Sequence, residues 1–209
     1  KAELKLTGSS AGLANVSVTL DNQTLSKSVN ITSVNILGVF NTRTMESFSS
    51  INGAINDPDT TDGDIITIAE GIYVENIVVN KRLTIKPVTG DVTVKAKNED
   101  QSVFVVSNEG SGSNIQGLNI ISSNESFGIS LSHAFNTNLL NNNISNSNRG
   151  MYLYLSGNNN ITNNNIRDSY HGIVLYKSHT NNISDNTIKD NENGIYFFNS
   201  HYNTINGTD

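Results

Sequence analysis

A repeat of apolar positions runs through the second half of the chain. Four glycines lie 22 residues apart; each directly precedes one apolar residue, and a second follows two positions later. Two further rows of aliphatic residues, five positions apart, lie upstream of each glycine. The glycines are Gly128, Gly150, Gly172 and Gly194; the rows after them are Ile129, Met151, Ile173, Ile195 and Leu131, Leu153, Leu175, Phe197; the upstream rows are Leu139, Ile161, Ile183, Ile205 and Ile144, Ile166, Ile188.

This spacing predicts three short strands per repeat. Alternate side chains of a strand point to opposite faces, so one row from each strand points inward, and equivalent rows stack about 4.8 Å apart. The segments between turn residues are too short for helical repeats. We therefore expect regular coils over residues 114–209, with each glycine allowing a tight turn at a strand start. Ile115 and Ile120 keep the five-residue spacing but lie farther from their glycine, which predicts a longer turn in that coil.

Asparagine follows the same register. The chain contains 35 Asn residues, and Asn142, Asn164 and Asn186 occupy equivalent positions at a bend between two strands. Stacked amides can donate to one coil and accept from the next, and Asn tolerates the left-handed conformation that bends require. The pattern predicts a structural Asn ladder.

The segment before the regular repeats has a different pattern. SFSSINGAIND has helical spacing at Phe48, Ile51 and Ile55, and it ends at the turn sequence DPDTTDGD. DIITIAEGIYVENIVVNKRLTIKP then alternates aliphatic strands with Gly and Asn-Lys turns. We expect a helix over residues 47–56 and coils from residue 64.

This opening and the NxIxxNxIx(5)GIxL repeats resemble the pectin-lyase-like parallel β-helix superfamily. They resemble more closely its NosD-type repeat proteins of archaeal cell surfaces, including adhesin-like and surface-layer-associated chains. The resemblance covers about residues 45–209. It implies an all-β, right-handed, single-stranded parallel β-helix of about 22 residues per coil, whose open end is capped by the helix at Ser47 to Asn56. It is specific for the fold and says little about function, because one fold hosts many activities.

Residues 1–42 lie outside this resemblance. ELKLT, NVSVTL, KSVNIT and VNILGVF alternate as strands do, with a hairpin turn expected at Asp21 to Gln23. A few such strands are marginal alone. We expect a β-rich arm or partial sandwich module at 1–42, which leans on the solenoid or pairs with a neighbouring molecule, and a parallel β-helix at 43–209.

Composition narrows the function. The net charge is −6 without clusters of Lys or Arg, which argues against nucleic-acid binding. The absence of Cys excludes disulfides and thiol chemistry, and no apolar run reaches the roughly 18 residues of a membrane helix. KAELKLTG lacks the apolar core of a secretory signal, so for an exported protein we expect the signal to have been removed upstream of this chain.

Catalytic candidates are few. The enzymes of the superfamily that the chain resembles act on acidic polysaccharides, which requires converging acids or a Ca²⁺ site with a basic residue. Asp168 and Asp190 occupy equivalent positions in consecutive coils, beside Arg167 and Lys189. A solvated bend with alternating charges explains the pattern equally well. Three further polar residues, Arg149, His171 and Lys177, lack an evident acidic partner.

Two groups are candidate metal ligands. The resemblance to NosD-type proteins suggests copper, and His179 and His201 share a register one coil apart, but no third ligand is evident. Asp57, Asp59, Asp62 and Asp64 are hard oxygen ligands of the kind that Ca²⁺ prefers, in a spacing that ordinary turns also produce. We predict no obligatory cofactor, with Ca²⁺ as the alternative.

Aromatic residues gather on the outer face of one predicted sheet. Alternation places Tyr152, Val174 and Tyr196 in one outward row and Tyr154, Tyr176 and Phe198 in the next. Such a face suits sugar rings or protein partners, and stacking between coils is the alternative explanation. Eight N-x-S/T sequons are candidate glycosylation sites: Asn15, Asn22, Asn30, Asn124, Asn143, Asn160, Asn182 and Asn206.

YNTING begins another coil, with Ile205 in register. An open solenoid end exposes apolar residues and unpaired edges, so we expect further repeats, or a partner that covers this end, such as the amino-terminal strands of another copy. The sequence thus predicts a non-catalytic, extracellular cell-surface solenoid with a structural or adhesive role, whose partners are other copies or other envelope proteins. The alternative is a β-helix that binds or cleaves carbohydrate.

Overall fold

The computed structural model describes residues 12–20, 23–31 and 38–209. The first two segments form an antiparallel hairpin of β1 (Gly12–Leu20) and β2 (Gln23–Ile31), with Leu20 opposite Gln23. The predicted strand ELKLT and residues Asp21 and Asn22 of the predicted turn lie outside the described residues. How the arm at 1–42 relates to the solenoid stays a prediction.

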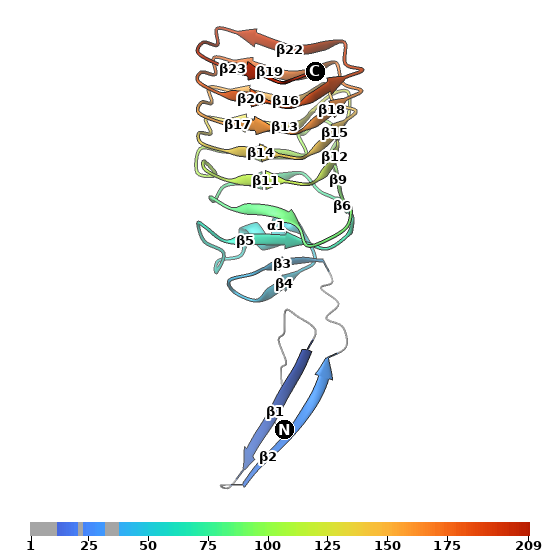
Figure 1. Cartoon of the computed structure of the whole chain (residues 1–209), viewed down its shortest axis with the longest axis vertical. Helices are drawn as coiled ribbons and strands as arrows, with labels where there is room; N and C mark the ends of the chain where they lie inside the picture. Colours follow the sequence, from blue (N-terminus) through green and yellow to red (C-terminus); the bar gives the residue numbers. More distant parts are fainter. Residues whose placement is uncertain (1–11, 21–22, 32–37) are drawn as a thin grey trace.

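The remaining residues form a parallel β-helix of three sheets (Figure 1). The first parallel sheet contains β5 (Ile65–Ile68), β8 (Thr84–Pro87), β11 (Asn114–Gln116), β14 (Asn138–Leu140), β17 (Asn160–Thr162), β20 (Asn182–Ser184) and β23 (Thr204–Asn206). The second contains β6 (Gly71–Val74), β9 (Val92–Lys95), β12 (Asn119–Ile121), β15 (Asn143–Ser145), β18 (Asn165–Arg167) and β21 (Thr187–Lys189). The third contains β7 (Ile77–Val79), β10 (Phe104–Val106), β13 (Phe127–Ser132), β16 (Arg149–Tyr154), β19 (His171–Tyr176) and β22 (Asn193–Phe198). Each coil contributes one strand to each sheet in turn, so the predicted fold class is confirmed.

The apolar rows predicted from the 22-residue period are in register. Leu139 pairs with Ile161 and Ile161 with Ile183, and the same alignment holds for Ile144, Ile166 and Ile188. The inward side chains of these rows are fully buried from the first coil to β20, except that the second row begins with the partly buried Tyr73. Burial of apolar area is the main stabilising term in folding, and here it is spread along the axis in a thin core.

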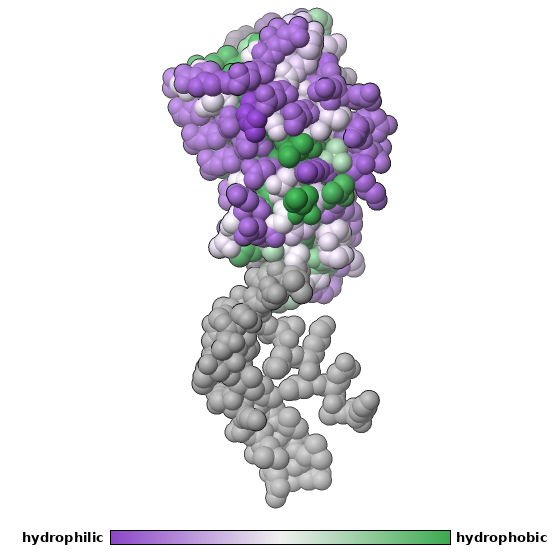
Figure 2. All heavy atoms as spheres, turned by 90° about the vertical axis from the view of Figure 1, so that its right-hand side faces the viewer, coloured by the Kyte–Doolittle hydropathy of each residue, from purple (hydrophilic) through white to green (hydrophobic). Residues whose placement is uncertain are grey.

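The outer face of the second sheet is mostly hydrophilic. Figure 2 views this side, and its hydrophobic groups gather over the lower coils. In β6, Ile72 and Val74 are 67% and 55% exposed. These two outward aliphatic residues pair with Thr93 and Lys95 in the next coil, and Asn and charged residues cover most of this sheet farther along.

The amino-terminal end of the β-helix has a cap of its own. Two antiparallel strands, β3 (Val39–Asn41) and β4 (Glu46–Phe48), extend the first sheet beyond β5. The helix α1 (Ile51–Asn56) follows and buries Ile51, Ala54 and Ile55 in the core. Ser50 is its N-cap, whose hydroxyl accepts a hydrogen bond from the Gly53 backbone N–H.

The helix predicted over 47–56 is therefore too long at its start. Ser47 and Phe48 belong to β4, and Phe48 packs against the core from that strand rather than from a helical face. The apolar spacing at Phe48 and Ile51 fits a helix, but Ser50 begins the helix because its side chain satisfies an otherwise unpaired backbone N–H. β3 lies within residues 1–42 and pairs with β5 of the solenoid.

At the other end the core opens. Ile183 is fully buried, whereas Ile205, one coil later, is 47% exposed, and Phe197 is 38% exposed. β21, β22 and β23 end their sheets, so each has one edge without a partner strand among the described residues. The carboxyl-terminal coil thus presents apolar side chains and unpaired backbone groups together.

Asn142, Asn164 and Asn186 form a continuous internal ladder. The Asn164 amide donates to the Leu139 carbonyl (2.8 Å) and to Oδ1 of Asn186 (3.0 Å), and it accepts from the Asn142 backbone N–H (2.9 Å). All three side chains are 1% exposed. Each amide satisfies backbone groups that would otherwise be buried without a partner, which is the costly state in a protein interior.

The left-handed residue at this bend is the one before each ladder residue. Asn141, Asn163 and Asp185 have φ near +55°, whereas the ladder residues do not. The expectation that the ladder residues adopt this conformation was wrong. Asn is favoured at the three ladder positions because its side-chain amide both donates and accepts hydrogen bonds, and not because of its backbone conformation.

The glycines also act differently from the prediction. Gly150 has no positive φ, and a Cβ there would collide with the Ile166 side chain and lie 2.7 Å from the Gly172 carbonyl oxygen. Glycine is required because the core of the neighbouring coil approaches the backbone, not because of a tight turn.

A second internal ladder was not predicted. Asn159, Asn181 and Asn203 repeat the same contacts at the bend between the third and first sheets, and the Asn181 amide donates to Ser156 O (3.1 Å) and Asn203 Oδ1 (3.0 Å). Their 22-residue spacing is visible in the sequence. Two such ladders hold the corners of the coil in a fixed shape.

Candidate functional site

An aromatic column lies on the outer face of the third sheet. Tyr154, Tyr176 and Phe198 are aligned in register from one coil to the next. The Tyr154 and Tyr176 rings stack with centroids 5.7 Å apart, and those of Tyr176 and Phe198 stack at 4.7 Å and 10°. The two tyrosines are half-buried and Phe198 is 39% exposed. The column supports the coils by stacking and still presents ring surface to solvent.

The neighbouring outward row is more covered. Tyr152, Val174 and Tyr196 are aligned as the alternation predicts, but Val174 is only 4% exposed whereas Tyr196 is 48% exposed. The Arg149 guanidinium lies over the Tyr152 ring at 4.9 Å and over the Phe127 ring at 4.8 Å. This row is therefore partly closed by contacts within the molecule.

Arg149 and His171 occupy the same register in adjacent strands. Burial, and then the charge of Arg149, lower the pKa of His171 below its ordinary value. Nε of Arg149 and Nδ1 of His171 are buried without a hydrogen-bond partner. Neither side chain forms an ion pair with a carboxylate among the described contacts, although the negative charge of Glu192 lies close enough to His171 to oppose the lowering of its pKa.

A third column runs along the turn after the third sheet. Phe135, Gly157, His179 and His201 are each 22 residues apart, and Phe135 and Gly157 are joined by a parallel bridge. The His179 and His201 rings stack with centroids 5.4 Å apart. Nδ1 of His179 accepts a hydrogen bond from the His201 backbone N–H (3.0 Å).

A pocket of about 240 Å³ opens at Gly157, where this column lacks a side chain. Its walls include Phe135, Leu155, Lys177 and His179. Of these residues the sequence analysis named Lys177 and His179. The sequence did contain a sign of this pocket. Gly157 interrupts a series of Phe and His residues that are spaced 22 positions apart.

Asp168 and Asp190 lie at equivalent left-handed turn positions, with φ of 54° and 57°. The carboxylate of Asp168 forms an ion pair with Arg167, the preceding residue, and both side chains are about half exposed. This geometry matches a solvated bend. No other acidic side chain converges on Asp168 among the described contacts.

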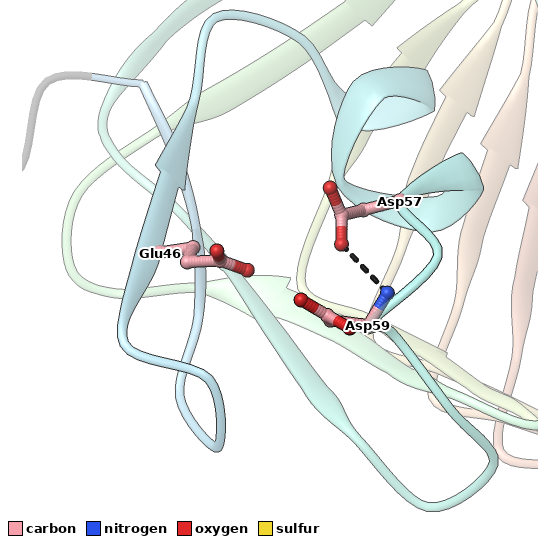
Figure 3. A group of neighbouring side chains, drawn as sticks. All are labelled: Glu46, Asp57 and Asp59. Atoms are coloured by element: carbon pink, nitrogen blue, oxygen red, sulfur yellow. Dashed lines mark hydrogen bonds between the residues drawn. The ribbon is translucent and has the colours of Figure 1, made fainter.

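Three carboxylates converge beside the amino-terminal cap (Figure 3). The ligand oxygens of Glu46, Asp57 and Asp59 lie within 4.8 Å of one another. Glu46 comes from β4, and Asp57 accepts a hydrogen bond from the Asp59 backbone N–H (2.8 Å). Two of the four predicted Ca²⁺ ligands thus meet, together with a glutamate that the sequence analysis missed.

The other two predicted ligands have different partners. Asp62 accepts a hydrogen bond from the Arg82 backbone N–H (2.9 Å). Asp64 is buried and accepts from Arg43 Nε (2.5 Å) and Asn41 Nδ2 (2.9 Å). The hydrogen bond from Arg43 is the main reason that the pKa of Asp64 falls to about 2. Asp64 therefore ties β3 and the following turn to the first coil.

The sequons differ in how their amides are engaged. Asn143 donates to Asn119 Oδ1 (3.2 Å) and Asn182 to Asn160 Oδ1 (2.8 Å), so these three lie in outward ladders on strands. Asn124, in the turn between β12 and β13, and Asn206, in β23, are exposed, and neither side chain is hydrogen-bonded among the described contacts. Asn22 lies outside the described residues, and so do the side chains of Asn15 and Asn30.

These features can be set beside known proteins. The family model described as "Periplasmic copper-binding protein (NosD)" matches residues 50–208. The chain belongs to the NosD family. The match covers the cap helix and all the coils, so the resemblance stated from the repeats is confirmed.

The copper in the NosD description does not fit the side chains of this chain. Copper favours imidazole and sulfur ligands, but the His179 and His201 rings stack 20° from parallel, and Nδ1 of His179 already accepts a backbone hydrogen bond. Within residues 38–209, the one convergent group of three metal-binding side chains consists of carboxylates. Carboxylates are hard ligands suited to Ca²⁺ rather than to copper.

A curated relative supports the predicted location. "Cell surface glycoprotein" of Methanothermus fervidus is 43% identical over 68 residues, which are 32% of this chain and 11% of the relative. The chain therefore spans about a tenth of that protein's length. Together with the NosD family match, this relative shows an extracellular surface protein with a β-helix fold.

A solved structure agrees on the fold. The catalytic domain of a GH87 α-1,3-glucanase in complex with tetrasaccharides matches with a TM-score of 0.53 and 21% identity, over 66% of this chain and 27% of the glucanase chain. At this identity the likeness establishes the β-helix alone. No helix in the described part of the chain has the length and apolarity needed to cross a membrane.

Proposed function

We propose that this NosD-family chain is a non-catalytic structural and adhesive solenoid of the cell envelope, of the surface-layer or adhesin-like kind. The observation that carries the proposal is the pair of buried Asn ladders, which join consecutive coils through side-chain as well as backbone hydrogen bonds. Such cross-links make a stiff, elongated unit whose outer residues are less constrained by the core than the inward rows. A stiff rod with a free outer surface suits spacing and contact at a cell surface.

The partner that we propose is a second copy or another envelope β-helix at the open carboxyl-terminal coil. Ile205 and Phe197 are exposed there beside the free edges of β22 and β23. A strand edge with an apolar row in register favours addition of another strand. The amino-terminal strands of a neighbouring copy are the segment that we expect to occupy it.

Sedimentation velocity tests the assembly. The full chain is expected to grow in sedimentation coefficient as its concentration rises, and deletion of residues 1–37, which leaves β3 in place, should abolish the growth. A full chain that stays monomeric at every concentration contradicts end-to-end assembly. A melting temperature measured for both proteins shows whether the shortened chain is folded.

A second function, carbohydrate binding, is favoured by the aromatic column of Tyr154, Tyr176 and Phe198. Flat exposed rings stack on the apolar faces of sugars, and stacked rings at successive coils offer a repeating platform. Cleavage is the remaining alternative. Turnover of a polysaccharide that is lost when Asp168 or Asp190 is changed to Asn would overturn the non-catalytic proposal.

A further inference from the structure

The pocket at Gly157 is a slot the size of one ring. Equivalent residues in consecutive coils are about 4.8 Å apart, so Phe135 and His179, two coils apart, are separated by about 9.6 Å along the axis. Gly157 leaves the intermediate position without a side chain, and the Phe135 ring lies 3.5 Å from where its Cβ would be. One flat ring inserted here continues the column from Phe135 to His179.

Two side chains around this slot offer free hydrogen-bond donors, whereas the Thr180 hydroxyl donates its own hydrogen to Asn158 and keeps only an acceptor oxygen. His179 accepts at Nδ1, so its hydrogen is on Nε2, which is left to donate. Asn158 uses its Oδ1 to accept from the Thr180 hydroxyl (2.7 Å), which leaves its amide N–H groups. Ser156 is occupied because its hydroxyl donates to backbone carbonyls and accepts from the Ala134 N–H.

Lys177 adds a positive charge to these donors. Its Nζ lies 5.5 Å from the centroid of the Tyr176 ring and has no carboxylate partner among the described ion pairs. The slot therefore combines apolar walls at Phe135 and Leu155 with one cation and further donors.

We propose that this slot binds a single sugar unit that carries an acidic group, a carboxylate or a sulfate. The ring stacks on Phe135, and the anion accepts hydrogen bonds from Lys177, Asn158 and His179, because a cation and two further donors are complementary to acceptor oxygens. The inference rests on the proposed carbohydrate-binding function and names its ligand class. The Tyr154–Tyr176–Phe198 column beside the slot extends the platform to neighbouring sugar units.

Isothermal titration calorimetry with the full chain tests this assignment. The probes are a galacturonic acid oligomer, a sulfated galactose oligomer and a neutral galactose oligomer of equal length. The wild type is expected to bind one or both acidic probes more tightly than the neutral one. Lys177→Gln should lower the affinity for the preferred acidic probe about tenfold, as expected for the loss of one charge-assisted hydrogen bond, and leave the neutral probe unchanged.

Two variants sharpen the comparison. Lys97→Gln makes the same charge change at an exposed turn of the second coil and should leave every affinity unchanged. Phe135→Ala should weaken all probes, because it removes the wall on which any ring stacks. Equal binding of acidic and neutral probes, an unchanged affinity in Lys177→Gln, or no binding of any sugar would each overturn the assignment.

These measurements distinguish a failure of the acidic-sugar slot from a failure of carbohydrate binding by the aromatic column or of end-to-end assembly. Tyr154→Ala and Tyr176→Ala weaken acidic and neutral sugars alike if the aromatic column binds carbohydrate. Only the variant at Lys177 changes the preference for acidic sugars. End-to-end assembly is measured by sedimentation, and the slot lies in the turns after β16 and β19, one coil before the free strand edges.

Discussion

Single residues at repeated positions carry most of the constraint on this fold. Gly150 and Gly194 are equivalent in sequence, but their surroundings differ. A Cβ at Gly150 would meet the core of the following coil, whereas nothing lies within 4 Å of a Cβ at Gly194 because no strand follows β22 in its sheet. The same residue type is therefore required in one coil and tolerated in the last.

This difference predicts opposite responses to one substitution. Gly150→Ala should lower the free energy of unfolding by about 1–3 kcal/mol through overpacking. Gly194→Ala should leave it within about 1 kcal/mol of the wild type, or raise it slightly, by restricting the unfolded chain. Urea unfolding followed by circular dichroism measures both. Equal losses in the two variants would show that the glycines serve a backbone conformation instead.

The Asn side chains of the sequons also differ from one another in how accessible they are to a glycosylating enzyme. In a host that performs N-glycosylation we expect glycan at Asn124, whose exposed amide has no described partner, and none at Asn143, which is half-buried and donates to Asn119. Glycopeptide mass spectrometry gives the occupancy of each site, and Asn124→Gln is the control for assignment. Glycan at Asn143 with Asn124 unmodified would contradict the expectation.

At the scale of secondary-structure elements, the amino-terminal cap of the β-helix is held by the buried carboxylate of Asp64. Asp64 accepts hydrogen bonds from Arg43 and Asn41, both from the segment at the amino-terminal end of the β-helix. Its folded pKa of about 2 lies below the value of about 3.9 in an unfolded chain. The ionised carboxylate therefore stabilises the folded state at neutral pH by on the order of 2 kcal/mol.

The sign of this shift fixes the pH dependence. The stabilisation is complete above about pH 4 and is lost as the pH falls toward 2, because the unfolded chain takes up the proton first. Thermal melting from pH 6 to pH 2 should show a steeper loss in the wild type than in Asp64→Asn, which is destabilised throughout. Asp91→Asn, at an exposed turn, should melt like the wild type at each pH. If the melting temperatures of Asp64→Asn and the wild type fell equally between pH 6 and pH 2, Asp64 would not be the source of the pH dependence.

The coils could be predicted from the sequence because their period repeats four times. The 22-residue spacing is enough to predict that Ile161 aligns with Ile183 and that Tyr154 aligns with Tyr176. The cap could not be predicted in this way, since Glu46 and Asp57 meet through a packing that occurs once. The slot at Gly157 had a signal in the period, but whether a missing side chain leaves a pocket depends on how Phe135 leans across it.

At the scale of the whole molecule, the open coil differs from the interior in what its apolar residues do. Ile183 and Ile205 pair directly in register, yet the first is fully buried and the second is 47% exposed. Ile183→Asp should unfold the carboxyl-terminal coils, because it buries an unpaired charge. Ile205→Asp should leave the melting temperature nearly unchanged and abolish the concentration-dependent sedimentation. If growth persists in Ile205→Asp, the open coil is not the contact surface.

The column of Phe135, Gly157, His179 and His201 has a consequence for how such chains diversify. These positions lie in turns outside the core, whereas the inward rows and the Asn ladders fix the coil. Substitutions at this position would therefore change which side chains border a slot, although a Cβ at Gly157 itself would lie 2.8 Å from the His179 carbonyl oxygen and would require the backbone to shift. The proposed recognition would in that sense be modular, because each added coil adds one more such position.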